Sequence, residues 1–175
     1  MANVSKMYTP EEVGRILKYS ELANGHAEAR HSMGGSGRKR REIADTGLDA
    51  RNLEEASAYK PGVQIGATHA CLNSPDGQKG LQALDDGAQR VVIRVSYNVV
   101  GYTARMRVSY GENFDACGMF YGGGGNLGHE DVDASHGVLV CEKREGTLHI
   151  VTSYPTRQPP GTLHANASDF NVRWT

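Results

Sequence analysis

Gly137 to Tyr154 reads GVLVCEKREGTLHIVTSY, and this stretch decides the fold class. Two runs rich in β-forming residues, Gly137–Arg144 and Thr147–Tyr154, flank the pair Glu145-Gly146. A short turn containing glycine between two such runs is typical of a β-hairpin. The C-terminal part of the chain is therefore predicted to hold antiparallel strands.

Two further strands are predicted upstream of the hairpin. Arg90–Val100 places Val91, Ile93 and Val95 on one face and alternates them with Val92, Arg94 and Ser96 on the other. Alternation of this kind predicts a strand. Tyr102–Tyr110 is predicted as the next strand, joined to the first by a tight connection near Gly101.

The N-terminal half carries helix signals instead. Thr9 is a good N-cap, Pro10 suits the first helical position and Glu12 completes a capping box, which predicts a helix over about residues 10–23. Ser74-Pro75-Asp76 marks a second start, with a helix running to about Gln89.

Between these helices the pattern is weaker. Residues 48–58 are predicted as a further helix with Leu53 and Ala56 facing inward, and a short extended piece is predicted around Val63–Ala67. Helices first and strands later is the order of an α+β fold. We expect one α+β domain over residues 1–175, with a helical part at about 9–89, a sheet part at about 90–155 and an extended tail at 156–175 that Trp174 anchors.

Composition limits the classes of function. The 175 residues are 38% hydrophobic and 22% charged with a net charge of −1, which favours a globular domain and argues against broad electrostatic capture of nucleic acid. Any contact with RNA must therefore be local. No run reaches the roughly 20 apolar residues of a membrane helix, and no signal-peptide pattern opens the chain. We expect a protein made in the cytoplasm, without membrane insertion, that a dedicated injection system could still export.

The first candidate site is a cluster of histidines and arginines. A short helix is predicted from His26 to Met33, with His31 on it, and the run Arg38-Lys39-Arg40-Arg41 follows a glycine-rich break. Histidine exchanges protons near neutral pH, and an arginine fork suits a phosphate. Together they are the minimum set for cleaving a phosphodiester without a metal. The alternative is a solvated basic face beside two ordinary histidines.

The second candidate site lies on the last predicted strand. Thr152 and Tyr154 are two residues apart, so their side chains project from the same face, while Val151 and Ser153 point the other way. Ordinary β packing would also explain this pair.

Taken together, the two ends of the chain suggest a family. Gly25-His26-Ala27-Glu28-Ala29-Arg30-His31 with the arginine-rich run behind it, and Thr152-Ser153-Tyr154-Pro155 near the other end, resemble two motifs of the bacterial RNase A-like toxin domains. Those domains occur at the C-terminal ends of contact-dependent inhibition proteins and other polymorphic toxins. The resemblance implies a metal-independent ribonuclease without a cofactor, with N-terminal helices packed on a twisted antiparallel sheet. It also implies an RNA substrate, a cognate immunity protein, and action in the cytoplasm of a target cell.

Residue roles carry over from the family motifs. His31 resembles the catalytic histidine and His26 the preceding motif histidine, while Arg40 or Arg41 matches the catalytic arginine. Thr152 and Tyr154 match the residues that complete the site, and Arg38 and Lys39 are expected to bind substrate. The chain departs from the pattern at Ala27, where the family usually has threonine, and at Ser32-Met33, which replaces valine and glycine.

Other features are given simpler interpretations. His129-Glu130-Asp131-Val132-Asp133 and His136 are expected to form an acidic turn rather than a metal site. Phe120–Asn126, which contains four consecutive glycines, is expected to be a surface loop. Cys71, Cys117 and Cys141 are expected to be free thiols. Two other functions remain open: a non-catalytic module of a secretion system or phage, and a toxin of another chemistry such as ADP-ribosyl transfer.

Overall fold

The computed structural model describes residues 2–25, 27–28, 32, 55–111, 126–156 and 172–174. Its helices are α1 (Pro10–Leu22), α4 (Gln64–Leu72), α5 (Pro75–Asp85) and α6 (Tyr97–Val100). Its strands are β1 (Glu55–Tyr59), β2 (Val91–Ser96), β3 (Arg105–Gly111), β4 (Asn126–Asp133), β5 (His136–Arg144), β6 (Thr147–Thr156) and β7 (Val172–Trp174). The predicted α+β class, with helices packed on strands, is confirmed.

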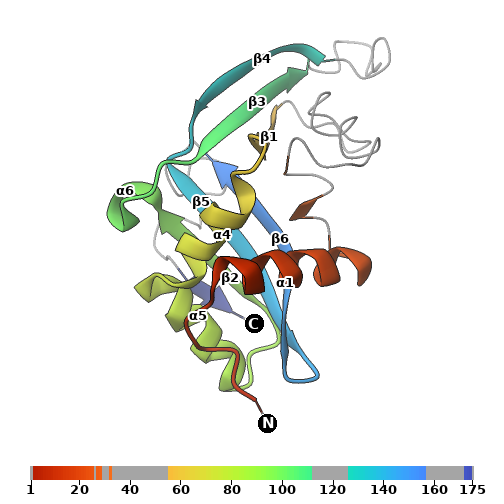
Figure 1. Cartoon of the computed structure of the whole chain (residues 1–175), viewed down its shortest axis with the longest axis vertical. Coiled ribbons are helices and arrows are strands. Elements are labelled where there is room, and N and C mark those ends of the chain that lie inside the picture. Colours follow the sequence, from red (N-terminus) through yellow and green to blue (C-terminus); the bar gives the residue numbers. More distant parts are fainter. Residues whose placement is uncertain are drawn as a thin grey trace.

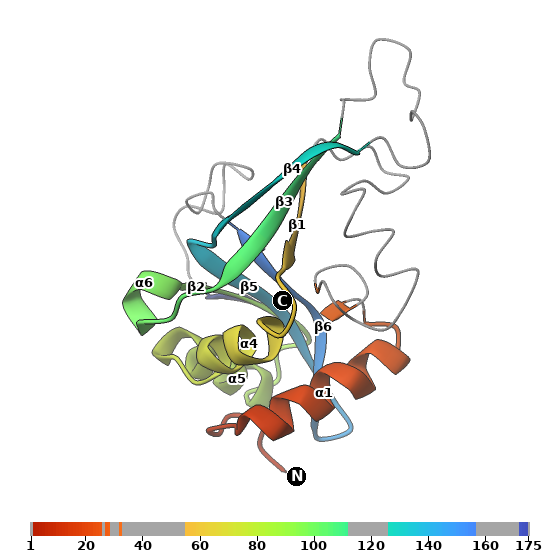
Figure 2. The ribbon, with the colours of Figure 1, turned by 45° about the horizontal axis from the view of Figure 1, so that its top comes forward.

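The strands form two antiparallel sheets instead of the single sheet that was predicted. Sheet A has the order β1-β3-β4, and sheet B has the order β6-β5-β2-β7. Figure 2 shows β1, β3 and β4 extending away from the helices as a separate ribbon. The division arises after Ser96, where the chain turns into α6 and leaves it through Gly101 at a φ of 66°. Consequently β2 and β3 lie in different sheets, although they are close in sequence.

The predicted hairpin is confirmed as β5 and β6. Glu145 and Gly146 join the strands at φ values of 52° and 78°. Two consecutive residues with positive φ are the signature of a type I′ turn, whose twist matches that of the flanking strands. Glycine meets this requirement without steric cost, which is why the pair was readable from the sequence.

The helices cover one face of sheet B. Helix α1 packs on β6, α4 on β5 and α5 on β2, and Figure 1 shows α1 and α4 in front of the strands. The core lies in this layer, where Leu17 of α1, Ile93 of β2, Leu139 of β5 and Ile150 of β6 are fully buried. The predicted capping box is confirmed, because Thr9 accepts from the backbone of Glu12 while the Glu12 side chain accepts from the backbone of Thr9. The predicted helix at Ser74 is also confirmed as α5.

The strand predicted over Arg90–Val100 ends at Ser96, because Tyr97–Val100 form helix α6. Two other local predictions were wrong. The helix predicted over 48–58 is contradicted at Glu55–Tyr59, which form β1 and pair with Met106–Tyr110 of β3. The extended piece predicted around Val63–Ala67 is instead the start of α4, which buries Ala67 and Cys71 four residues apart against the core. In both cases a partner distant in sequence decides the conformation, which local propensity does not report. The C-terminal end of the predicted tail is strand β7, whose three residues pair with β2.

Candidate functional site

Strand β6 carries Thr152 and Tyr154 on one face of sheet B. Thr152 pairs with Val140 and Tyr154 with Val138 on β5, so both side chains stand on the same side. Ser153 faces the helices, where its hydroxyl lies 2.7 Å from the hydroxyl of Thr68 in α4. The prediction that Thr152 and Tyr154 share a face opposite Ser153 is therefore confirmed.

A β-bulge in β6 determines that Thr152 and Tyr154 lie on the face of sheet B opposite the helices. Cys141 pairs with Ile150 and Val140 with Thr152, so Val151 has no partner of its own on β5. Strict alternation would place Ile150 and Thr152 on the same face. The extra residue reverses the alternation. Ile150 consequently packs into the core, and Thr152 points away from the helices.

Side chains from two other elements, α1 and β1, hydrogen-bond to the outer edge of β6. The hydroxyl of Ser20 in α1 accepts from the backbone N–H of Ile150 at 2.9 Å. The hydroxyl of Ser57 in β1 donates to the carbonyl of Pro155 at 2.7 Å. These bonds satisfy backbone groups that an edge strand would otherwise leave unpaired.

The same edge receives the N-terminal motif segment. The buried Gln64 side chain donates through Nε2 to the carbonyl of Ala27 at 2.8 Å and to that of Ser153 at 3.0 Å. Gly25 lies so close that a Cβ there would be 3.1 Å from the carbonyl oxygen of Ile150 and 2.6 Å from that of Ser20. The beginning of the Gly25–His31 motif thus lies directly against the strand that carries Thr152 and Tyr154.

We name the side of sheet B that points away from α1, α4 and α5 the distal face. Three rows of paired residues cross it, and their order follows from the register of β2, β5 and β6. The rows are Ser96, His136 and Thr156; then Arg94, Val138 and Tyr154; then Val92, Val140 and Thr152. A histidine, an arginine and a tyrosine therefore occupy neighbouring positions on three adjacent strands.

Electrostatics link these three groups. Burial, and to a smaller extent the Arg94 guanidinium, lowers the pKa of His136 below its ordinary value. Burial raises the pKa of Tyr154, and the charge of Arg94 acts against that increase. The lowered pKa favours the neutral imidazole of His136, which is the form that accepts a proton.

Two buried polar atoms on the distal face stand out. Thr152 Oγ1 and His149 Nε2 have no hydrogen-bond partner among the residues that the structure describes, and each side chain is 6% exposed. His149 pairs across the strands with Glu142, which also binds Arg90 and Arg144. Burial, with Arg144 and Arg90 nearby, lowers the pKa of His149. Buried polar atoms nearly always have a partner, so these two atoms call for an explanation such as strain, a catalytic role or a bound water.

The structure does not describe the remaining predicted site residues. His26, His31, Arg38, Lys39, Arg40 and Arg41 lie outside the described residues. Sequence reasoning did not select Arg94, and it assigned His136 to an acidic turn. The alternation of β2 does place Arg94 on the side away from the core, but only the pairing of β2 with β5 brings it beside His136.

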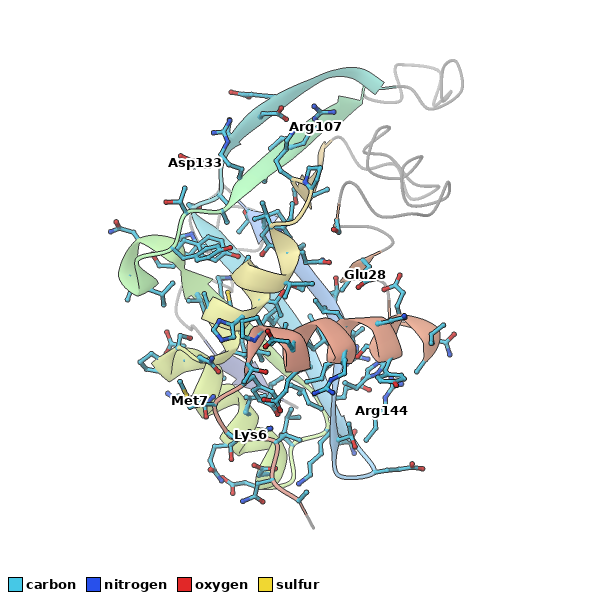
Figure 3. The ribbon with its side chains drawn as sticks, in the orientation of Figure 1. Lys6, Met7, Glu28, Arg107, Asp133 and Arg144 are labelled. Carbon is cyan, nitrogen blue, oxygen red and sulfur yellow. The ribbon has the colours of Figure 1, made fainter. Side chains whose placement is uncertain are left out.

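The predicted acidic turn was wrong. Residues 126–133 form strand β4, and the turn comes after it, at Ala134 and Ser135. The Asp131 carboxylate binds Arg107 and Lys60, both at 2.9 Å, and these hydrogen bonds hold its pKa well below the ordinary value. Figure 3 shows Arg107 and Asp133 on sheet A, far from Lys6 and Met7. Within the described ranges, no group of three or more His, Cys, Asp or Glu is arranged to hold a metal ion.

Two of the three cysteines are described, and both are free and buried, as predicted. Burial raises the pKa of Cys71 to about 12 and that of Cys141 further above its ordinary value. A thiol reacts as the thiolate, so neither cysteine is suited to act as a nucleophile.

Searches of protein-family models, curated proteins and solved structures found no match to this chain. Among the described helices, none is long and apolar enough to cross a membrane.

Proposed function

We propose that this chain is a metal-independent ribonuclease of the RNase A-like toxin kind. One observation carries the proposal: Gly25 and Ala27 lie against the edge of β6, and Gln64 joins Ala27 to Ser153. The two motifs that resemble the toxin family are more than a hundred residues apart in sequence, yet their described parts meet. A shared site is what a catalytic role for both motifs requires.

The reaction follows from the chemistry of RNA. The 2′-oxygen attacks the adjacent phosphorus, the bond from phosphorus to the 5′-oxygen breaks, and the products are a 2′,3′-cyclic phosphate and a 5′-hydroxyl end. His31 acts as a general acid or base, and Arg40 or Arg41 stabilises the charge on the phosphorane. Thr152 and Tyr154 donate hydrogen bonds to phosphate oxygens. His26, the preceding motif histidine, belongs to the same catalytic set, and Arg38 and Lys39 contact the neighbouring RNA.

The biological setting is part of the same proposal. A dedicated secretion system delivers the domain from the producing cytoplasm into the cytoplasm of a competitor cell. A cognate immunity protein binds the domain and protects the producer. The formal charge of −1 supports a site that engages RNA locally, as opposed to a broadly basic surface.

The test is cleavage of a 5′-labelled oligoribonucleotide in the presence of EDTA, with the product ends identified by mass spectrometry. We expect 2′,3′-cyclic phosphate ends and undiminished activity in EDTA. Tyr154→Phe and His31→Ala should reduce cleavage, whereas Tyr19→Phe, on the exposed surface of α1, should not. Intact RNA, or cleavage abolished by EDTA, would contradict the proposal.

The non-catalytic alternative predicts a different outcome. A structural or binding module would leave RNA intact and would not arrest growth when expressed in a bacterial cytoplasm. An ADP-ribosyl transferase would arrest growth but would consume a nicotinamide dinucleotide and leave RNA intact.

A further inference from the structure

Helix α4 buries two polar side chains on the face that it turns toward β6. Gln64 is 3% exposed and Thr68 is fully buried, and the two lie one helical turn apart. The Thr68 hydroxyl lies 2.7 Å from the hydroxyl of Ser153, the residue between Thr152 and Tyr154. We infer that Thr68 is a positioning residue, which holds this part of β6 in place through the Ser153 hydroxyl. The inference rests on the proposed function, because it concerns the placement of two residues of that site.

The sheet itself restrains this part of β6 only weakly. Among the described strands, β6 lies at an edge of sheet B and has β5 as its one neighbour. The pairing shifts between Val140 and Cys141, which places the bulge directly before Thr152. A bulge interrupts the ladder of hydrogen bonds and increases the local twist of the strand. Contacts from outside the sheet therefore have a strong influence on where Thr152 and Tyr154 lie.

Thr68 and Ser153 supply such a contact in the interior of the protein. Both residues are fully buried, and a hydrogen bond is stronger there than in water. Separating the two hydroxyls would leave buried polar groups unpaired, so the pair resists displacement of the strand. The Ser153 hydroxyl also acts on Tyr59 of β1: burial raises the pKa of Tyr59 well above its ordinary value, and hydrogen bonds from Tyr97 and Ser153 act against that increase. Ser153 is thus held from α4 and from β1.

Packing alone does not explain a hydroxyl at position 68. The other side chains that α4 buries near it, Ala67, Cys71 and Leu72, are apolar or weakly polar and fully buried. A valine would fill the place of Thr68 with nearly the same shape and would avoid the cost of removing a hydroxyl from water. The bond to Ser153 is what offsets that cost.

Two substitutions at position 68 separate the role of the hydroxyl from that of the methyl group. Thr68→Val keeps the shape and removes the hydroxyl, whereas Thr68→Ser keeps the hydroxyl and leaves a small cavity. Tyr8→Phe is the control, because it removes another buried hydroxyl, which donates to the carbonyl of Val4 at 2.6 Å within the N-terminal segment. For each variant, kcat and KM are measured for cleavage of a labelled oligoribonucleotide in EDTA, and the melting temperature is measured beside them.

The variants are expected to differ in kcat more than in stability. Thr68→Val should lower kcat about 10-fold and leave KM within about twofold of the wild type, since a misplacement of about 1 Å costs up to about 100-fold. Thr68→Ser should retain more than about half of the wild-type kcat, although its melting temperature also falls. Tyr8→Phe should melt about 2–4 °C lower and keep the wild-type kcat. Ser153→Ala should resemble Thr68→Val, and the double variant should be no slower than the slower single variant, because both remove the same bond.

The outcomes separate the inference from the proposed function. If the wild type cleaves RNA in EDTA and Thr68→Val does so with the same kcat, the inference is wrong and the proposed function stands. A kcat that falls in step with the melting temperature in every variant, Tyr8→Phe and Thr68→Ser included, also overturns the inference, because a purely structural role predicts that result. Additive losses in the double variant would show that Thr68 does not act through Ser153. If the wild type leaves RNA intact, the proposed function fails and the inference fails with it.

Discussion

Replacing Gln64 with leucine removes the side chain that joins Ala27 to strand β6. Gln64 is 3% exposed, and its Nε2 donates to the carbonyls of Ala27 and Ser153 at 2.8 and 3.0 Å. Leucine has similar bulk but no donor. The substitution therefore leaves two carbonyl groups without this partner, in residues that are 1% and 0% exposed.

The magnitude follows from the number of lost partners. Each buried carbonyl left unsatisfied costs about 1–3 kcal/mol. Two of them cost about 4 kcal/mol at the middle of that range, and the apolar burial of leucine returns about 1 kcal/mol. We expect the free energy of unfolding to fall by about 3 kcal/mol, which for a chain of 175 residues lowers the melting temperature by about 6–12 °C.

Gln78 provides a matched control. Its Nε2 also donates to two carbonyls, those of Lys6 and Leu72, at 2.8 and 2.9 Å. Gln78 is only half-buried, so water replaces much of what Gln78→Leu removes, and we expect a loss below about 1 kcal/mol. Urea unfolding followed by circular dichroism measures both variants. Equal losses for Gln64→Leu and Gln78→Leu would refute the reasoning that the buried bridge is what joins the two segments.

Three further predictions concern single positions. Thr152→Val should leave the free energy of unfolding unchanged or raise it by up to about 1 kcal/mol, because it removes an unsatisfied buried hydroxyl. The same substitution should slow RNA cleavage. A large loss of stability would show that the hydroxyl has a partner. Burial acts to raise the pKa of Asp85, but hydrogen bonds from Lys143 and from Ser5 outweigh it and hold the pKa below the ordinary value. The Asp85 carboxylate therefore contributes its full stabilisation above about pH 4, and this contribution is lost as the pH falls further. Acid unfolding of Asp85→Asn should lack this dependence, and an unchanged acid profile would contradict it. Gly137→Ala should lower the free energy of unfolding by about 1–3 kcal/mol, because a Cβ there would lie 2.3 Å from the hydroxyl oxygen of Tyr97. A melting temperature equal to that of the wild type would exclude this clash.

Several elements could be predicted from the sequence because their determinants are local. The capping box of α1 is made within four consecutive residues, and the hairpin turn depends on two residues with positive φ. The segment around Val63–Ala67 was misread because its conformation depends on burial of α4 against β5 and β6. The same holds for β1, which is a strand because β3 lies beside it.

Some features of the candidate site were likewise determined by the sequence, and others by the tertiary structure. The sequence alone determined that Thr152 and Tyr154 share a face, because side chains two apart on a regular strand without a bulge do so. Only the tertiary structure decided which face that is, since the bulge at Val151 depends on how β6 pairs with β5. It also decided the neighbours, Arg94 and His136, because strand pairing brings together residues whose separation in sequence carries no local signal. A two-residue period is a property of the chain, whereas register is a property of the fold.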